Sequence, residues 1–83
     1  MQVNRVVGAL VDHSPLTGEQ ASAALGHSRS YISMIKQRRA PTLATVADVA
    51  DVCGCDVVIV DRATGERVGV VEPPRREQAS GKD

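Results

Sequence analysis

The chain has 83 residues, 42% of them hydrophobic, and its ten Lys plus Arg balance ten Asp plus Glu. A chain of this length forms one small domain, and its apolar stretches are too short to cross a bilayer. An enzyme is disfavoured, because so short a chain hardly encloses a pocket and contains neither a P-loop nor a GxGxxG fingerprint.

The first residues lack the basic segment and the long apolar run of a signal peptide, so we expect a cytoplasmic protein. Reducing conditions there disfavour a disulfide between Cys53 and Cys55. A structural metal site usually needs four ligands, and His13 and His27 lie far upstream of this pair. We therefore expect no metal and no other cofactor, with Cys53 in the core and Cys55 at a helix-to-strand junction.

The first part of the chain predicts two short helices. An apolar stripe with helical spacing predicts the first over residues 2–12. Thr17, followed three residues later by Gln20, has the pattern of a capping box and starts a second helix over residues 18–25. Gly26 stands where a left-handed terminator is expected. The stripe of the first helix comprises Val3, Val6, Val7, Leu10 and Val11.

Two more helices are predicted after this turn. Ser28 is the expected N-cap of the third, over residues 29–37, and Thr42 is the expected cap of the fourth, over residues 43–53. Gly54 ends the fourth helix. The core-facing side chains are expected to be Ile32, Ile35, Leu43, Val46, Ala47, Ala50 and Cys53.

Residues 56–72 change to the pattern of a β-hairpin, with two β-branched runs around "RATG". Gly65 suits the left-handed position of the turn. The expected register places Val58 opposite Val70 and Val60 opposite Val68, with Asp61 facing Arg67. Residues 73–83, which include Arg75 and Arg76, have no apolar period, and we expect a solvated or disordered tail after a domain that spans residues 1–72.

Both faces of this hairpin are apolar, and a lone hairpin with two apolar faces is barely stable in water. We expect one face to pack on the helices and the other on a second copy of the chain. One arrangement of this contact joins the two hairpins in a four-stranded sheet. The residues expected at this dimer interface are Val49, Val52, Val57, Ile59 and Val71.

A basic run, residues 26–41, holds four of the ten cations and no acid. Such a run is often only a solvated helix face. Here, however, it belongs to two capped helices joined by a glycine turn, which is typical of a helix-turn-helix. Its second helix would enter the major groove of DNA, where the first turn lies nearest the base edges. The base-contacting candidates are Arg29, Ser30, Ser33 and Met34.

The sequence resembles the Cro/C1-type (Xre-type) helix-turn-helix family over roughly residues 3–55. The resemblance is carried by Leu16-Thr17, by Leu25-Gly26, by Ser28 with Ser30-Tyr31-Ile32-Ser33, and by Pro41-Thr42-Leu43. It implies a mainly α fold, with a four-helix lambda-repressor-like domain followed here by the hairpin. It also implies double-stranded DNA as the partner and a homodimeric transcription regulator, which we expect to be a repressor of a near-palindromic operator.

The family's base-reading positions fall on Arg29, Ser30 and Met34, with Ser33 nearby. Its phosphate positions, with the residues that flank them, give the expected phosphate-contacting set of Thr17, Gly18, Ser28, Tyr31, Lys36, Gln37, Arg38 and Arg39. Tyr31 has an alternative role as a cover for the core beside Ile35, and Met34 as a packing or merely exposed residue.

Three features depart from the family pattern. Gly18 stands where a longer polar side chain is common. Ser22 occupies a small position, usually Ala, and its hydroxyl needs a partner. The family's last helix is replaced by the hairpin, which resembles the ending of some antitoxins. The alternative function is therefore a protein-binding module, such as an antitoxin that neutralises a cognate toxin through the hairpin.

Overall fold

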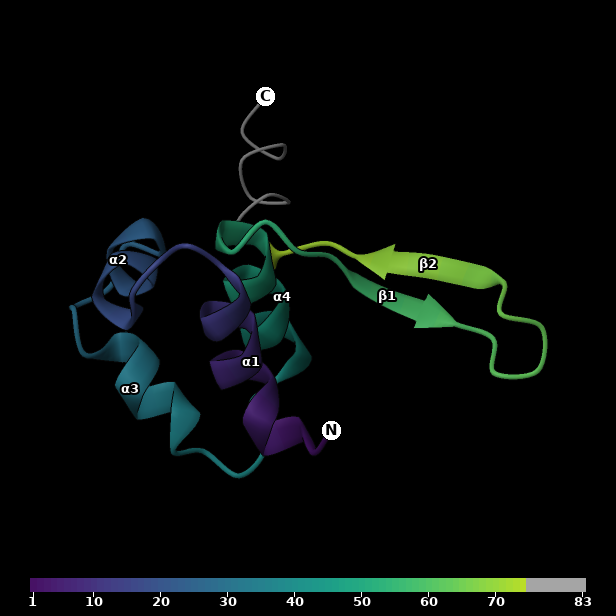
Figure 1. The fold of residues 1–83 in the computed structure, drawn as a ribbon, viewed down its shortest axis with the longest axis horizontal. Helices are drawn as coiled ribbons and strands as arrows, with labels where there is room; N and C mark the ends of the chain where they lie inside the picture. Colours follow the sequence, from purple (N-terminus) through teal and green to yellow (C-terminus); the bar gives the residue numbers. More distant parts are fainter. Residues whose placement is uncertain (75–83) are drawn as a thin grey trace.

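In the computed structural model, which describes residues 1–74, short helices form a body from which a β-hairpin projects (Figure 1). The described elements are η1 (Val3–Arg5), α1 (Val6–His13), α2 (Gly18–Ala24), α3 (Tyr31–Lys36), α4 (Leu43–Val52), β1 (Val57–Val60) and β2 (Arg67–Val71). The predicted mainly α fold with a C-terminal hairpin is confirmed. Most of the expected tail, including Arg75 and Arg76, lies outside the described residues; Pro73, which is described, is buried.

The predicted helix signals at α2 and α4 are present as hydrogen bonds. The Gln20 backbone N–H donates to Thr17 Oγ1 at 3.1 Å, and the Thr17 N–H donates to Gln20 Oε1 at 2.9 Å. Thr42 Oγ1 accepts from the Thr45 N–H at 3.2 Å. Gly26 has a φ of +78°, so the left-handed terminator after α2 is confirmed.

The start of α3 differs from the prediction. The N-cap position is Ser30 rather than Ser28, and its side chain makes no capping hydrogen bond. Ser28 Oγ instead lies 3.3 Å from Ser30 Oγ, and the Tyr31 N–H donates to the Ser28 carbonyl at 3.0 Å. This separate turn occupies the two positions expected to open the helix. Arg29 and Ser30 therefore precede α3.

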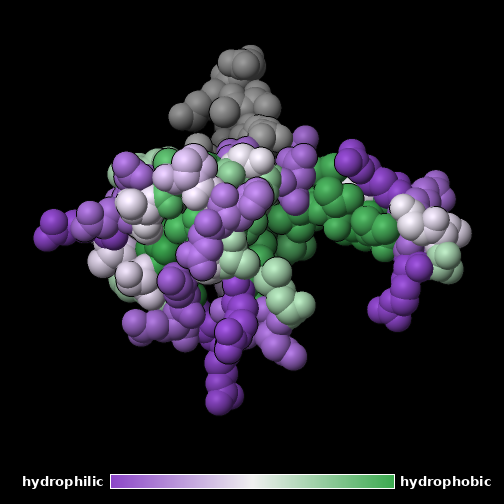
Figure 2. Space-filling model, viewed as in Figure 1, coloured by the Kyte–Doolittle hydropathy of each residue, from purple (hydrophilic) through white to green (hydrophobic). Residues whose placement is uncertain are grey.

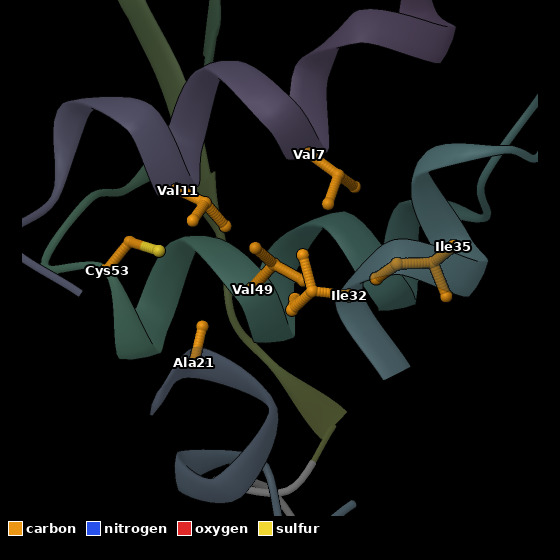
Figure 3. Packing of buried hydrophobic residues seen from close by; sticks show 7 residues of the cluster. All are labelled: Val7, Val11, Ala21, Ile32, Ile35, Val49 and Cys53. Carbon is orange, nitrogen blue, oxygen red and sulfur yellow. The ribbon is translucent and has the colours of Figure 1, made fainter. Parts of the chain in front are cut away.

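The core is formed by small apolar side chains that point inward from the four α-helices and the end of α4 (Figure 3). Val49 has 0% of its surface exposed, so its predicted place at a dimer interface is wrong: the small core needs this side chain. Val52 packs against the same cluster. Leu43 was expected in the core but is 57% exposed, because it borders a surface groove with Val3 and Val6 instead of joining the core cluster. The core cluster comprises Val7, Val11, Ala21, Ile32, Ile35, Val49 and Cys53.

Ser22 is the only polar residue in the described part of the chain whose side chain is fully buried. Its Oγ donates to the Gly18 carbonyl at 2.8 Å and accepts from the Ile32 backbone N–H at 3.0 Å. The second bond ties α2 to the first turn of α3 and satisfies an N–H that water cannot reach. The partner that the Ser22 hydroxyl needs is thus supplied by the neighbouring helix.

The hairpin register agrees with the prediction at one end only. Val58 pairs with Val70 as expected, but Val60 lies opposite Arg67, after a bulge between Ile59 and Val60. The expected pairing of Val60 with Val68 is therefore wrong. The physical reason lies in the turn, where Asp61 Oδ1 accepts from the Ala63 N–H at 2.8 Å and from the Thr64 N–H at 3.2 Å. The Asp61 carboxylate therefore stabilises the turn and does not face Arg67 across the strands.

The packing of the hairpin also differs from the prediction. It points away from the helices, so that neither face lies on the helical body along its length (Figure 1). Val57 and Val58 at its base are half-buried, whereas Ile59 and Val68 are 51% and 68% exposed. The hairpin is thus an arm with apolar side chains on both faces.

We predict that Ser22→Ala lowers the free energy of unfolding by about 1–3 kcal/mol, because it leaves the buried Ile32 N–H without an acceptor. Urea unfolding followed by circular dichroism measures this change. The control is Ser33→Ala, an exposed serine on α3, which should change stability by less than about 0.5 kcal/mol. Equal stabilities for the two variants would contradict the assigned role of the Ser22 hydroxyl.

Candidate nucleic-acid interface

The beginning of α2 and the outer side of α3 border one surface groove of about 640 Å³. The tie through Ser22 sets the distance between these two helices, and Ile32 on the inner side of α3 forms part of the groove floor. Five of the residues expected to contact DNA are brought together here. They are Thr17, Gly18, Arg29, Ser33 and Lys36.

The side of α3 away from the core carries the remaining base-contacting candidates. Ile32 and Ile35 point into the core, which leaves Ser33 and Met34 on the exposed side, and Met34 is 55% exposed. Arg29 and Ser30 are exposed in the turn that leads into the helix. The Arg29 guanidinium forms no ion pair with any carboxylate in residues 1–74. It is therefore available to an external partner.

The other phosphate-contacting candidates flank the groove at both ends of α3. Ser28 lies in the turn before the helix, and Gln37, Arg38 and Arg39 follow its last residue; all four are exposed. An elongated anion lying along α3 would meet polar or cationic groups at each end.

Lys36 differs from the other cations in its position. It borders the groove, but its side chain lies along α1, with Cε 3.5 Å from the point that a Cβ on Gly8 would occupy. This is ordinary van der Waals contact, so a side chain at position 8 would not exclude Lys36. Lys36 thus bridges α3 and α1 at the edge of the groove.

The space around position 18 does not require a glycine. A Cβ at this position would lie 3.7 Å from Ile32 Cγ2, which is ordinary van der Waals contact. A longer polar side chain would therefore fit, as in the family pattern. Its absence leaves the backbone of α2 as the surface that Gly18 presents to the groove.

Tyr31 has the covering role that was the alternative to phosphate contact. It is half-buried and packs against the core cluster. Its ring stacks on that of His27, with centroids 3.8 Å apart and an interplanar angle of 11°. This stack joins the turn after α2 to the first turn of α3, so Tyr31 also helps to position the turn that holds Arg29.

Sequence reasoning did not anticipate two acids in the groove, Asp12 from α1 and Glu19 from the first turn of α2. The basic run contains no acid, but the fold brings these carboxylates next to it. A negative charge is favourable at a helix N-terminus, which gives Glu19 a local role in α2. The consequence is a weaker positive potential over the groove than the basic run alone suggests.

The two cysteines are free thiols. Burial raises the pKa of the Cys53 thiol; a hydrogen bond with Ser14 lowers it in part, and the neighbouring Cys55 raises it further. Cys53 is therefore a neutral core residue at neutral pH, as its position in the core cluster indicates. Residues 1–74 contain no group of three or more His, Cys, Asp or Glu side chains placed to hold a metal ion.

Residues 16–60, more than half of the chain, match the family model described as Helix-turn-helix. The match covers α2, the turn, α3 and α4, and it ends with β1. No curated protein and no solved structure matches the chain. Among the described residues, each helix is too short to span a bilayer.

We predict that Glu19→Gln strengthens binding to random duplex DNA roughly two- to fivefold at low salt, because it removes one negative charge from the groove. Fluorescence anisotropy with a labelled duplex measures the affinity, and the gain should shrink as salt screens the charge. Glu66→Gln makes the same charge change on the exposed hairpin, away from the groove. Equal gains from both variants would show that only net charge matters.

Proposed function

This chain belongs to the Cro/C1-type helix-turn-helix family of DNA-binding transcription regulators, and we propose that it is a sequence-specific repressor that binds a near-palindromic operator as a homodimer. One observation supports this most. The exposed Arg29 and Ser33 share a groove with Thr17 and Gly18 at the start of α2, so base-reading and phosphate-contacting groups face the same way.

In the proposed complex α3 lies in the major groove. Arg29, next to the helix N-terminus, donates two of its guanidinium N–H groups to the O6 and N7 atoms of a guanine. Ser33 bonds to a base edge one turn further along, and the Met34 side chain touches a thymine methyl group. These three contacts carry the sequence preference, since phosphates are the same at every step.

Phosphate contacts hold α3 in register. Thr17 and Gly18 approach one backbone, and Gln37, Arg38 and Arg39 approach the backbone at the other end of the helix. Each cation that neutralises a phosphate releases a counterion, so affinity falls steeply with salt. These contacts set the orientation of the protein on the duplex and contribute to binding any sequence.

A homodimer follows from the small size of the reading surface. The helix α3 has six residues, a length of about 9 Å, and reaches only a few base pairs. A second copy doubles the number of bases read, and two-fold symmetry requires two inverted half-sites about 34 Å apart. The proposed operator is near-palindromic for this reason, and repression follows where the bound dimer blocks the transcription machinery.

We predict that Arg29→Ala weakens binding to the operator roughly 5- to 150-fold for each half-site, the loss expected for one bidentate contact to guanine of about 1–3 kcal/mol. Binding to random duplex should change much less. Arg38→Ala or Arg39→Ala should weaken both by a similar factor and reduce the salt slope by about one unit for each protomer bound. The operator is first obtained by selecting bound sequences from a random duplex pool.

Arg62→Ala is the matched control, because it removes an exposed arginine from the hairpin turn, far from the groove. It should leave both affinities unchanged. If Arg29→Ala weakened operator and random duplex by the same factor, Arg29 would be a phosphate contact and the sequence preference would have to come from other residues of α3.

The exposed arm supports a second candidate function, a protein-binding module such as a toxin-neutralising antitoxin. Apolar side chains on both faces of a hairpin are typical of a surface that captures a partner. The two functions are separated by retention on random duplex at low salt with release as salt rises. We predict retention; a chain that passes through the column would favour the protein-binding function.

A further inference from the structure

A second hollow lies on the exposed side of α1, next to the groove between α2 and α3. This α1 hollow has a volume of about 340 Å³, and it shares Asp12 and Lys36 with the neighbouring groove. The middle of α1 lines it with the small residues Gly8 and Ala9, so no long side chain from this part of the helix fills the space. The complete lining is Asn4, Arg5, Gly8, Ala9, Asp12 and Lys36.

The segment after α3 is held beside the start of α1 at two points. At one point Lys36, the last residue of α3, borders the α1 hollow together with Arg5. At the other point the buried Pro41 lines an apolar groove with Val6, the first residue of α1. Residues 37–40 connect these two points and therefore pass close to the start of α1 (Figure 1).

This path gathers four cations around the start of α1. Arg38 and Arg39 lie within the connecting segment, and Arg5 and Lys36 border the α1 hollow; all four are exposed. Figure 2 shows hydrophilic side chains gathered along this edge of the helical body, over the end of α3 and the start of α1. The fold thereby adds Arg5 to the cations of the basic run, from which it is distant in the sequence.

Acidic side chains do not cancel this charge. Residues 1–11 and residues 20–47 contain no Asp or Glu. Among the described residues, Asp12 is the one carboxylate in the lining of the α1 hollow, and it lies almost two turns beyond Arg5, about 10 Å along the helix axis. The Arg5 guanidinium forms no ion pair within residues 1–74. It is therefore free to bind an anion from outside the chain.

We propose that the α1 hollow binds a backbone phosphate of the duplex whose major groove holds α3, and that Arg5 is the residue that contacts it. The guanidinium of Arg5 suits two parallel hydrogen bonds to the phosphate oxygens, and Lys36 adds a second positive charge from α3. The Asn4 amide supplies a neutral donor at the same hollow. The ligand is a phosphodiester of double-stranded DNA, and the inference rests on the proposed DNA-binding function.

The position of this contact gives it a distinct effect. Val7 and Val11 on the buried side of α1 pack in the same core cluster as Ile32 and Ile35 of α3, so the orientation of α3 follows that of α1. Phosphate contacts made by the segment after α3 lie close to the axis of that helix, whereas Arg5 lies on another helix, away from the axis. A phosphate bound there resists rotation of the helical body about α3 and keeps the base-reading side chains facing the bases.

We predict that Arg5→Ala weakens binding to the operator and to random duplex by the same factor, roughly three- to tenfold for each protomer bound, because it removes one phosphate contact. The salt slope should fall by about one unit for each protomer. Fluorescence anisotropy over a series of salt concentrations measures both quantities. The Arg5 side chain is exposed, so the fold should persist, which circular dichroism checks.

Two variants and one chemical probe complete the experiment. Arg62→Ala removes an exposed arginine that lies outside both hollows and should leave the affinity and the salt slope unchanged. Arg5→Lys keeps the positive charge and should keep the wild-type salt slope. Ethylation of single operator phosphates removes their negative charge, and one phosphate in each half-site should matter for the wild-type chain but not for Arg5→Ala.

The outcomes separate this inference from the proposed function. If Arg5→Ala bound duplex with wild-type affinity and wild-type salt slope, the phosphate contact would be wrong and DNA binding through α3 would stand. A loss of affinity without a change in the salt slope would also overturn the contact, because Arg5 would then act through the structure of α1. If Arg5→Ala lowered the salt slope on random duplex but selection yielded no preferred sequence, the phosphate contact would stand and the sequence-specific repressor would be overturned.

Discussion

The hydrogen bond from the Ile32 N–H to the buried Ser22 hydroxyl is the contact on which the proposed DNA-binding surface depends. Two short helices cannot hold an angle by themselves, because seven and six residues provide fewer than two turns each. Ser22 supplies the missing constraint from inside the pair. Gly26 allows the chain to reverse tightly, and the stack of His27 on Tyr31 closes the outer side of the same turn. Arg29 owes its position to these three local contacts.

The charged side chains then set the electrostatic potential of this surface, whose shape is determined by packing. The basic run gives the outer side of α3 its positive charge, and Asp12 and Glu19 moderate it at the groove. A weaker positive potential suits a protein that recognises a DNA sequence. A strongly positive surface binds every duplex, whereas on a weakly positive one the total affinity depends more on contacts with bases. The neutral overall charge of the chain is consistent with this balance between the basic run and the acids.

The elements with strong local signals were predictable from the sequence. The capping box at Thr17 and Gln20, the left-handed glycines at 26, 54 and 65, and the inward positions of Ile32 and Ile35 all depend on interactions within a few residues. The predictions that were wrong concern residues for which two interactions compete, either with a neighbour in the sequence or with a distant element of the fold. Ser28 bonds to Ser30 instead of capping α3, and Asp61 accepts hydrogen bonds within its own turn. Val49 is buried in the core. The acids of the groove were missed because their approach to α3 arises only from the packing of α1 and α2.

The bulge between Ile59 and Val60 has a consequence for how many chains can associate. The segment Val57–Val60 is short, strongly β-forming and uncharged, which is the composition of a strand that recruits further strands without limit. A bulge interrupts the regular ladder and increases its twist, and the arginine opposite Val60 places a charge on the neighbouring strand. Growth of a fibre along the free edges is thereby blocked, and an aggregation-prone sequence is kept within a finite assembly.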